Sequence, residues 1–249
     1  MTATARSRQV IFTLRAPHMR AIRLPALLAL FGPVCVLPAP AADEPTEKEF
    51  QTAVIRLKDL GIAFHNYGDT NGGKWADDIT DKDGRPLLSW RVALLPYIEE
   101  TPLYKQFKFD EPWDSDHNKK LIEKMPKTYQ PVRGKAKPGE TFLQRFVGKD
   151  ALFNENGSDY KISTVPDGTS NTALVVEAGD PVVWTKPTDL TFIPKAPLPK
   201  LGGPFNGPFH VLLGDGSVHL FKKDFDVNEM RNVIMPADGN VVDFNKLQK

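Results

Sequence analysis

The segment Thr46–Gly68, TEKEFQTAVIRLKDLGIAFHNYG, decides the fold that we expect for this chain. Its apolar residues recur at spacings of 4, 3, 4 and 3, which places them along one side of an α-helix: Phe50, Val54, Leu57, Gly61 and Phe64, flanked by Ala53 and Leu60. Thr46 and Glu49 have the spacing of a capping box, which predicts where the helix begins. Gly68 can adopt the left-handed conformation that ends helices, and residues 69–73 cannot continue one. Such a helix needs a layer over its apolar side, and we expect later strands to supply it.

A β-hairpin near the C-terminus is the clearest candidate for that layer. The runs 209–214 and 217–221 flank Asp215-Gly216, which predicts two strands joined by a two-residue turn. The face that we expect on the long helix carries the pairs Leu213–Val218 and Val211–Leu220, and the other face carries His210–Phe221 and Leu212–His219. Further strands are expected at residues 141–147, 173–177, 182–184 and 241–244.

Several short helices are expected around this core. Ser89 can cap a helix over residues 90–100, which Pro96 must kink or split. Other short helical segments are expected at residues 103–107, 116–124 and 227–234, the last capped by Asp226. The predicted fold class is therefore α+β: a long N-terminal helix packed on an antiparallel sheet, with short peripheral helices, in a single domain over residues 42–249.

Residues 1–41 are typical of an export signal. Arg20 and Arg23 precede an apolar stretch that runs to about residue 37, and Ala39-Pro40-Ala41 forms a small-x-small cleavage site. The stretch is shorter than the roughly 20 residues that a membrane span needs. We therefore expect cleavage before Ala42 and a periplasmic, cell-surface or extracellular protein with no membrane span after cleavage. An uncleaved signal that serves as an anchor stays open, and so does the start of translation, at Met1 or Met19.

The composition excludes several classes of function. Residues 1–41 hold five arginines and no acidic residue, so the remainder of a chain with net charge +1 is mildly acidic. Nucleic-acid surfaces need clustered basic residues, so we expect no nucleic-acid partner. The only cysteine, Cys35, lies in the predicted signal, which leaves no disulfide or thiol chemistry. Neither a nucleophile elbow nor a phosphate-binding glycine pattern occurs, so we predict no enzyme, and no catalytic or cofactor-binding residue.

Two histidines form the first candidate site. In the expected register, His210 and His219 are diagonal neighbours on one hairpin face, roughly 7–8 Å apart between α-carbons. Two imidazoles so placed could help to ligate zinc, but the sequence offers no third ligand. The alternative is that both are structural residues of a half-exposed strand, and we assign no metal ligand.

Acidic and aromatic residues supply the other candidates. The loop that contains Asp77, Asp78, Asp81 and Asp83 matches only a fragment of a calcium-binding loop, and the alternative is a solvated loop. Glu177, at the end of an apolar run, is the carboxylate that we expect to be buried. The rings that could stack on a small ligand or glycan are Trp75, Trp113 and Trp184.

Four motifs resemble the family known as domain of unknown function 1559, which is abundant in planctomycetes. They are LGIAFHNYGDTNG, then DKDGRPLLSWRVALLPYIEETPLYKQFKFDEPWDSDHNKKLIEKMP, then VPDGTSNTALVVEAG and finally LLGDGSVHLF. The resemblance implies a head domain similar to type IV pilins and type II secretion pseudopilins, with a long helix on an antiparallel sheet. It implies no catalytic residue. In place of the family's prepilin segment, this chain has the predicted signal peptide.

Three functional hypotheses follow. The leading one is an exported, non-enzymatic envelope protein with a structural or interaction role, related to pseudopilins and acting through a protein partner in the envelope. The second is a binding module for a small ligand or glycan. The third is a metal enzyme centred on His210 and His219. The sequence does not distinguish oligomeric states.

Overall fold

The long helix α1 (Glu47–Thr70) begins where the sequence predicts. The computed structural model of the 249-residue chain describes residues 46–203 and 207–248, so the predicted signal peptide, Cys35 and both candidate start codons lie outside the described residues. The amide of Glu49 donates to Thr46 Oγ1 at 3.3 Å, and the amide of Thr46 donates to Glu49 Oε2 at 2.9 Å. The predicted capping box is therefore confirmed.

The predicted end of α1 at Gly68 is wrong by two residues. Gly68 stays helical and buried, and the left-handed glycines are Gly72 (φ 68°) and Gly73 (φ 82°). A Cβ on residue 68 would lie 2.4 Å from Cδ1 of Ile162. Gly68 therefore lets Ile162 pack closely on the helix, and it does not form the helix end.

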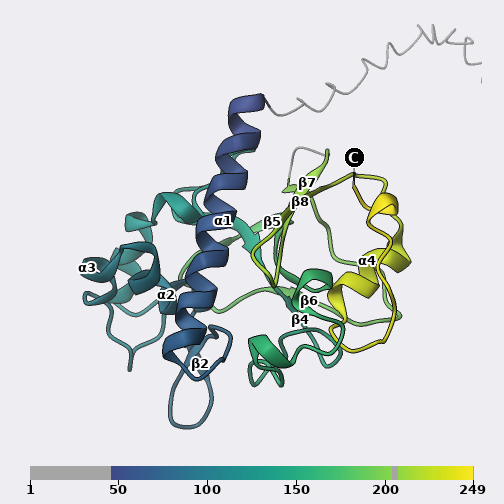
Figure 1. Ribbon diagram of the computed structural model, residues 1–249. Coiled ribbons are helices and arrows are strands. Elements are labelled where there is room, and N and C mark those ends of the chain that lie inside the picture. Colours follow the sequence, from purple (N-terminus) through teal and green to yellow (C-terminus); the bar gives the residue numbers. More distant parts are fainter. Residues whose placement is uncertain (1–45, 204–206, 249) are drawn as a thin grey trace, which may run out of the picture. The chain divides into compact units, whose positions relative to one another are not determined.

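Four antiparallel strands form the main sheet, in the order β3-β5-β7-β8. They are β3 (Glu140–Gln144), β5 (Ala173–Val183), β7 (Phe209–Leu213) and β8 (Val218–Phe221). The separate strand expected at residues 182–184 does not exist: β5 runs on through Val182 and Val183, which pair with Thr141 and Glu140 of β3. Figure 1 shows α1 running along this sheet. The predicted α+β class is confirmed.

The predicted hairpin exists, but its register is shifted by one residue. Leu212 lies opposite Val218 and Val211 lies opposite His219. The amide of Leu213 donates to the carbonyl of Ser217 at 2.9 Å, so the loop holds three residues rather than two. Gly216 takes a φ of 87°, as the third residue of such loops does.

The shift reverses the expected faces of β7, whereas Val218 of β8 lies on the α1 side as expected. Leu212 faces α1, where a Cβ on Gly61 would lie 3.2 Å from its Cδ1. Val211 instead belongs to the apolar cluster of α4 (Val227–Ile234), together with Met230. The expectation that Val211 and Leu213 face the long helix is therefore wrong, because a one-residue slip turns every side chain to the opposite face.

Two smaller sheets lie beside the main one. In the first, β1 (Ile79–Thr80) pairs antiparallel with β2 (Pro86–Leu88), and in the second, β4 (Phe146–Val147) pairs parallel with β6 (Leu190–Thr191). The strand expected over residues 141–147 is thus broken at Arg145. The proline-rich segment after residue 186 contributes β6.

The short helices confirm most expectations. Pro96 separates α2 (Trp90–Ala93) from the 3₁₀-helix η1 (Leu95–Ile98), and Ser89 caps α2 through the amide of Arg91. Asp226 caps α4 by accepting from the amides of residues 228 and 229. The remaining short helices are α3 (Thr101–Tyr104), η2 (Asn118–Lys124), η3 (Lys127–Tyr129), η4 (Ile162–Thr164), η5 (Thr169–Asn171) and η7 (Phe244–Lys246).

The last predicted strand, at residues 241–244, is absent. The amide of Asp243 donates to Glu229 Oε2 at 3.1 Å, and the carboxylate of Asp243 accepts from the amide of Asn245 at 3.1 Å. These side-chain hydrogen bonds replace a strand ladder and start η7 instead.

Candidate functional site

The two candidate histidines lie on opposite faces of the sheet. His210 pairs with Leu220, and His219 pairs with Val211, so their side chains point apart. The predicted juxtaposition is wrong, because it depends on the two-residue turn that the chain does not form. Within residues 46–203 and 207–248, no group of three His, Cys, Asp or Glu residues could hold a metal ion.

His219 packs at the C-terminal end of the chain. Its ring stacks on Phe244 at a centroid distance of 5.0 Å, and its Nε2 lies 3.1 Å from Ser217 Oγ. Burial lowers the pKa of His219. The surroundings are those of a structural histidine.

His210 is fully buried and belongs to a cluster with Glu177 and Arg133. Glu177 Oε2 accepts three hydrogen bonds: from the amide of His210 (2.8 Å), from His210 Nδ1 (2.9 Å) and from Arg133 Nη2 (2.9 Å). Burial alone would raise the pKa of Glu177, but the hydrogen bond from His210 and the charge of Arg133 outweigh it, so the pKa is lowered. The predicted burial of Glu177 is confirmed.

Arg133 lies in the basic, proline-containing segment of residues 129–139 and is itself buried. Its side chain is 4% exposed, and it also donates to the carbonyl of Pro208 at 2.9 Å. Tyr129 is fully buried and donates to the carbonyl of Arg91. The segment therefore packs against the rest of the domain, because the guanidinium of Arg133 pairs with the buried carboxylate of Glu177.

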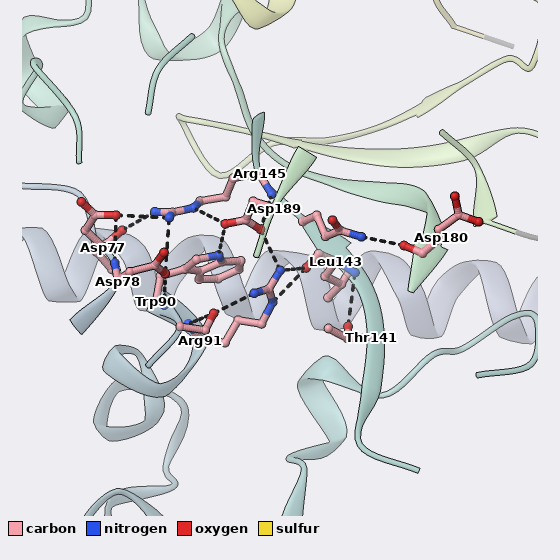
Figure 2. Close-up of polar contacts among 12 residues, drawn as sticks. Asp77, Asp78, Trp90, Arg91, Thr141, Leu143, Arg145, Asp180 and Asp189 are labelled. Atoms are coloured by element: carbon pink, nitrogen blue, oxygen red, sulfur yellow. Dashed lines mark hydrogen bonds and ion pairs between the residues drawn. The ribbon is translucent and has the colours of Figure 1, made fainter. Parts of the chain in front are cut away.

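A second and larger polar cluster surrounds Asp189 (Figure 2). Arg91 Nη2 lies 2.8 Å from Asp189 Oδ1, and Arg145 Nε lies 3.1 Å from Asp189 Oδ2. The side chains of Arg91, Arg145 and Asp189 are at most 2% exposed. Trp90 Nε1 donates to Asp189 Oδ2 at 3.0 Å, so the buried carboxylate has a donor on each oxygen.

Two further carboxylates complete this cluster. Arg145 Nη2 lies 3.1 Å from Asp77 Oδ1 and 3.6 Å from Asp78 Oδ1, and the amide of Trp90 donates to Asp78 Oδ1 at 2.7 Å. Burial raises the pKa of Asp78 to about 6, with Asp189 adding to the rise and Arg145 opposing it. Three carboxylates thus share two guanidinium groups.

The Asp189 cluster fixes the expected acidic loop in place. Asp77 and Asp78 are partly buried ion-pair partners rather than solvated residues. Asp81 and Asp83 instead bind Arg85, at 2.7 and 3.1 Å. The first half of the loop therefore pairs with Arg145 outside it and the second half with Arg85 inside it, and the interpretation as a solvated loop is wrong for the first half.

The sequence reasoning missed Arg91, Arg145 and Asp189. One signal was available: Arg145 interrupts the apolar run that ends in Phe146-Val147, and a charge in such a position needs a buried partner. The partner could not be found, because Asp189 lies 44 residues from Arg145 and 98 residues from Arg91. Chemically the cluster holds segments together: its carboxylates are all engaged, and it contains no nucleophile.

The tryptophans do not form a stacking surface. Trp75 is 4% exposed and Trp184 is fully buried, with Nε1 of Trp184 donating to the carbonyl of Ile122. Trp113 is partly buried against the core. Two of the three rings that could stack on a small ligand or glycan therefore belong to the core.

The outward side of α1 is the remaining feature of interest. Ile55 and Ile62 are 57% and 59% exposed, although Leu57, Leu60 and Phe64 on the same helix are buried. In the described part of the chain, no helix is both long enough and apolar enough to span a membrane.

Comparison with known proteins finds a family match over part of the chain. No curated protein and no solved structure matches it. The family model described as "Protein of unknown function (DUF1559)" matches residues 54–143, which run from the middle of α1 into β3 and include Asp77, Asp78 and Arg91. The family that the resemblance predicts is therefore the one whose model matches residues 54–143.

Proposed function

We propose that this protein is an exported envelope protein without a catalytic role, related to type II secretion pseudopilins, that acts by binding another envelope protein through the outward side of α1. The observation that carries the proposal is the exposure of Ile55 and Ile62 on this side. The two residues are seven apart, which places them on one stripe of the helix.

Polar residues border this stripe. Lys58, Asp59 and Asn66 are exposed on the same side of α1. An apolar seam with a polar border is the usual composition of a surface that binds another helix or strand.

The available energy indicates what kind of contact this is. Full burial of one isoleucine contributes about 1.5–3 kcal/mol, and each of these two is already about two-fifths buried. Covering both therefore contributes roughly 1.7–3.5 kcal/mol, which is too little for a stable complex by itself. The seam is suited to a larger interface of which α1 forms the centre.

The start of α1 is consistent with such a role. Residues 47–52 include no fully buried residue, and Ala53 is the first. Figure 1 shows α1 extending at its start beyond the neighbouring elements, and within these turns Phe50 packs on His210 of β7 at a centroid distance of 5.1 Å. The clusters around Asp189 and Glu177 face inward, which supports a role that does not depend on chemistry at an open site.

Photo-crosslinking in cells tests the proposal. A photoreactive residue is placed at position 62, and in a control at position 241, where Val241 is 90% exposed but lies outside α1. We expect one discrete crosslinked envelope protein from position 62 and none from position 241, with Ile55→Lys abolishing the product. Mass spectrometry of the native N-terminus establishes in parallel whether the mature chain starts at Ala42.

Two results would contradict the proposal. One is a crosslinking pattern that is the same from both positions, because it would mean that exposed aliphatic residues in general are captured. The other is recovery of the protein from the cytoplasmic fraction with its N-terminus intact.

A further inference from the structure

The exposed side chains of α1 form one continuous stripe. When successive residues are placed about 100° apart around the helix, every exposed residue from position 48 to position 69 falls within an arc of about 100°. The other side chains between these positions are at least partly covered by the domain. The stripe consists of Lys48, Gln51, Ile55, Lys58, Asp59, Ile62, Asn66 and Asp69.

Four of these residues lie seven positions apart along the middle of the stripe. Lys48 is at one end and Asp69 at the other, with Ile55 and Ile62 between them. A second copy of α1 that runs in the opposite direction therefore places its Asp69 against Lys48 and its Ile62 against Ile55. This line of residues is self-complementary, as a two-fold symmetric interface requires.

The charges at the centre of the stripe match in the same alignment, because Lys58 faces Asp59 of the second copy. In the part of the chain that the structure describes, Lys48, Lys58, Asp59 and Asp69 form no ion pair. A parallel alignment would instead oppose Lys48 to Lys48 and Asp69 to Asp69. Like charges disfavour that alignment, so the charge pattern selects the antiparallel one.

A hollow in the surface of α1 fits a side chain from the second copy. It measures about 330 Å³, and its helical lining includes Lys58, Gly61, Ile62 and His65. Residues with this spacing form the hole that receives one side chain of a facing helix in knobs-into-holes packing. Gly61 has no side chain to fill the hole. The antiparallel alignment centres Ile55 of the second copy on this hollow.

We propose that the outward stripe of α1 pairs with the same stripe of a second copy of this chain, in an antiparallel and two-fold symmetric dimer. The proposal rests on the binding role proposed above for this side of α1, and it names the partner. Ile55 of each copy enters the hollow of the other, and the exposed amides of Gln51 and Asn66 meet in the same register. Ion pairs between Lys48 and Asp69 close the interface at both ends.

Sedimentation equilibrium of the protein, purified with its native N-terminus, measures the association. We expect a monomer–dimer equilibrium with a Kd on the order of 50 µM, because one pair of helices makes a small interface. Ile55→Ala shortens the side chain that enters the hollow and is expected to weaken the dimer about tenfold. Val241→Ala, at a residue that is 90% exposed and lies outside α1, is the matched control and is expected to leave the Kd unchanged.

Exchange of the end charges tests the antiparallel alignment. Lys48→Glu and Asp69→Lys each oppose like charges at both ends of the dimer and are each expected to weaken it about tenfold. The double variant, and an equimolar mixture of the two single variants, are expected to recover the wild-type Kd within about threefold, because every facing pair again has opposite charges. Both substitutions suit the helix dipole, so α1 is expected to remain folded.

A second pair of variants controls for net charge. Lys195→Glu and Asp224→Lys are exposed, lie outside α1 and change the net charge by the same amounts. We expect the wild-type Kd from each of them and from their mixture. An equal loss in these controls, no recovery in the double variant, or sedimentation as a monomer at about twentyfold above the expected Kd would each overturn the dimer.

Photo-crosslinking from position 62 separates this inference from the proposed function. A product that contains only peptides of this chain supports the dimer. A product with a different envelope protein overturns the dimer and leaves the proposed binding role of α1 intact. The absence of any discrete product overturns both.

Discussion

Replacement by asparagine is expected to stabilise the folded protein at Asp78 and to destabilise it at Asp189, although both aspartates belong to the same cluster. Asp78 has its pKa raised to about 6 from 3.8, so its ionised form is less favourable in the folded protein than in the unfolded chain. Below pH 3.8 both states are protonated and the residue has no effect. Between 3.8 and about 6 the folded state keeps a proton that the unfolded chain loses, so stability falls as pH rises, and above 6 the cost is constant.

The size of the effect follows from that difference of about two pKa units. Each unit corresponds to 1.36 kcal/mol, so ionised Asp78 costs about 3 kcal/mol at pH 8. Asparagine resembles the protonated acid, and its carbonyl can still accept from the amide of Trp90. Asp78→Asn is therefore expected to raise the free energy of unfolding by about 3 kcal/mol at pH 8 and by about zero at pH 3.

Asp189→Asn is expected to lower the free energy of unfolding. The side chain of Asp189 is 2% exposed and pairs with both Arg91 and Arg145. Removing its charge leaves two buried guanidinium groups without their shared partner, a change that typically costs about 3–5 kcal/mol. The exposed Asp83→Asn is the matched control and should change stability by less than about 0.5 kcal/mol.

Urea denaturation between pH 3 and pH 8 measures all three variants. The slope of unfolding free energy against pH should be more positive in Asp78→Asn than in the wild type between pH 4 and pH 6, because the negative contribution of Asp78 is removed. A destabilised Asp78→Asn at pH 8, or a gain that is the same at every pH, would refute the assignment of a strained carboxylate. A neutral effect of Asp189→Asn would show that the arginines find other partners.

Other changes test the packing, the capping and the second buried cluster. Gly61→Ala places a Cβ 3.0 Å from the α-carbon of Gly216, so we expect a loss of about 1–3 kcal/mol, measured as a lower Tm. Asp226→Ala removes two hydrogen bonds at the start of α4 and should cost about 1 kcal/mol in urea denaturation. Glu177→Gln leaves Arg133 buried with a neutral partner and should cost about 3–5 kcal/mol at pH 7. Because the pKa of Glu177 is lowered, its contribution is present above pH 4.5 and is lost as pH falls, so the variant should lose less stability than the wild type in acid.

The helices were predictable because their signals are local. Thr46 and Glu49 are three residues apart, and Asp226 immediately precedes α4, so capping can be read from a few neighbouring residues. Pro96 splits its helix for an equally local reason, since it lacks an amide donor. The fold class followed from one amphipathic helix and several apolar runs.

The buried clusters were not predictable, because their partners are far apart in the sequence. The contact between Arg133 and Glu177 spans 44 residues, and the contact between Arg91 and Asp189 spans 98. Asp189 itself lies in a proline-rich segment that has no periodic pattern. Local reasoning assigned such charges to the surface, where most charged residues lie.

The hairpin register shows how tertiary contacts override a strong local signal. Asp215-Gly216 favours a two-residue turn by itself, and that turn would have put Val211 and Leu213 on the long helix. The observed loop of three residues instead brings Gly216 against Gly61. A Cβ added to residue 61 would lie only 3.0 Å from the α-carbon of Gly216. Two glycines that face each other let α1 approach the end of the hairpin closely, so that Leu212 fills the space beside the helix.

This register also determines where the polar residues go. It places His210 on the helix side, where Glu177 accepts from both its amide and its ring, and it sends His219 to the opposite face. With the two-residue turn, the two imidazoles would share a face and Glu177 would lack its two donors from residue 210. The alternative register would therefore leave a buried carboxylate with fewer donors, at a cost of about 1–3 kcal/mol for each one lost. The chain thus adopts the longer loop because burial of Leu212 and satisfaction of Glu177 both require it, and the same choice removes the metal site that the sequence suggested.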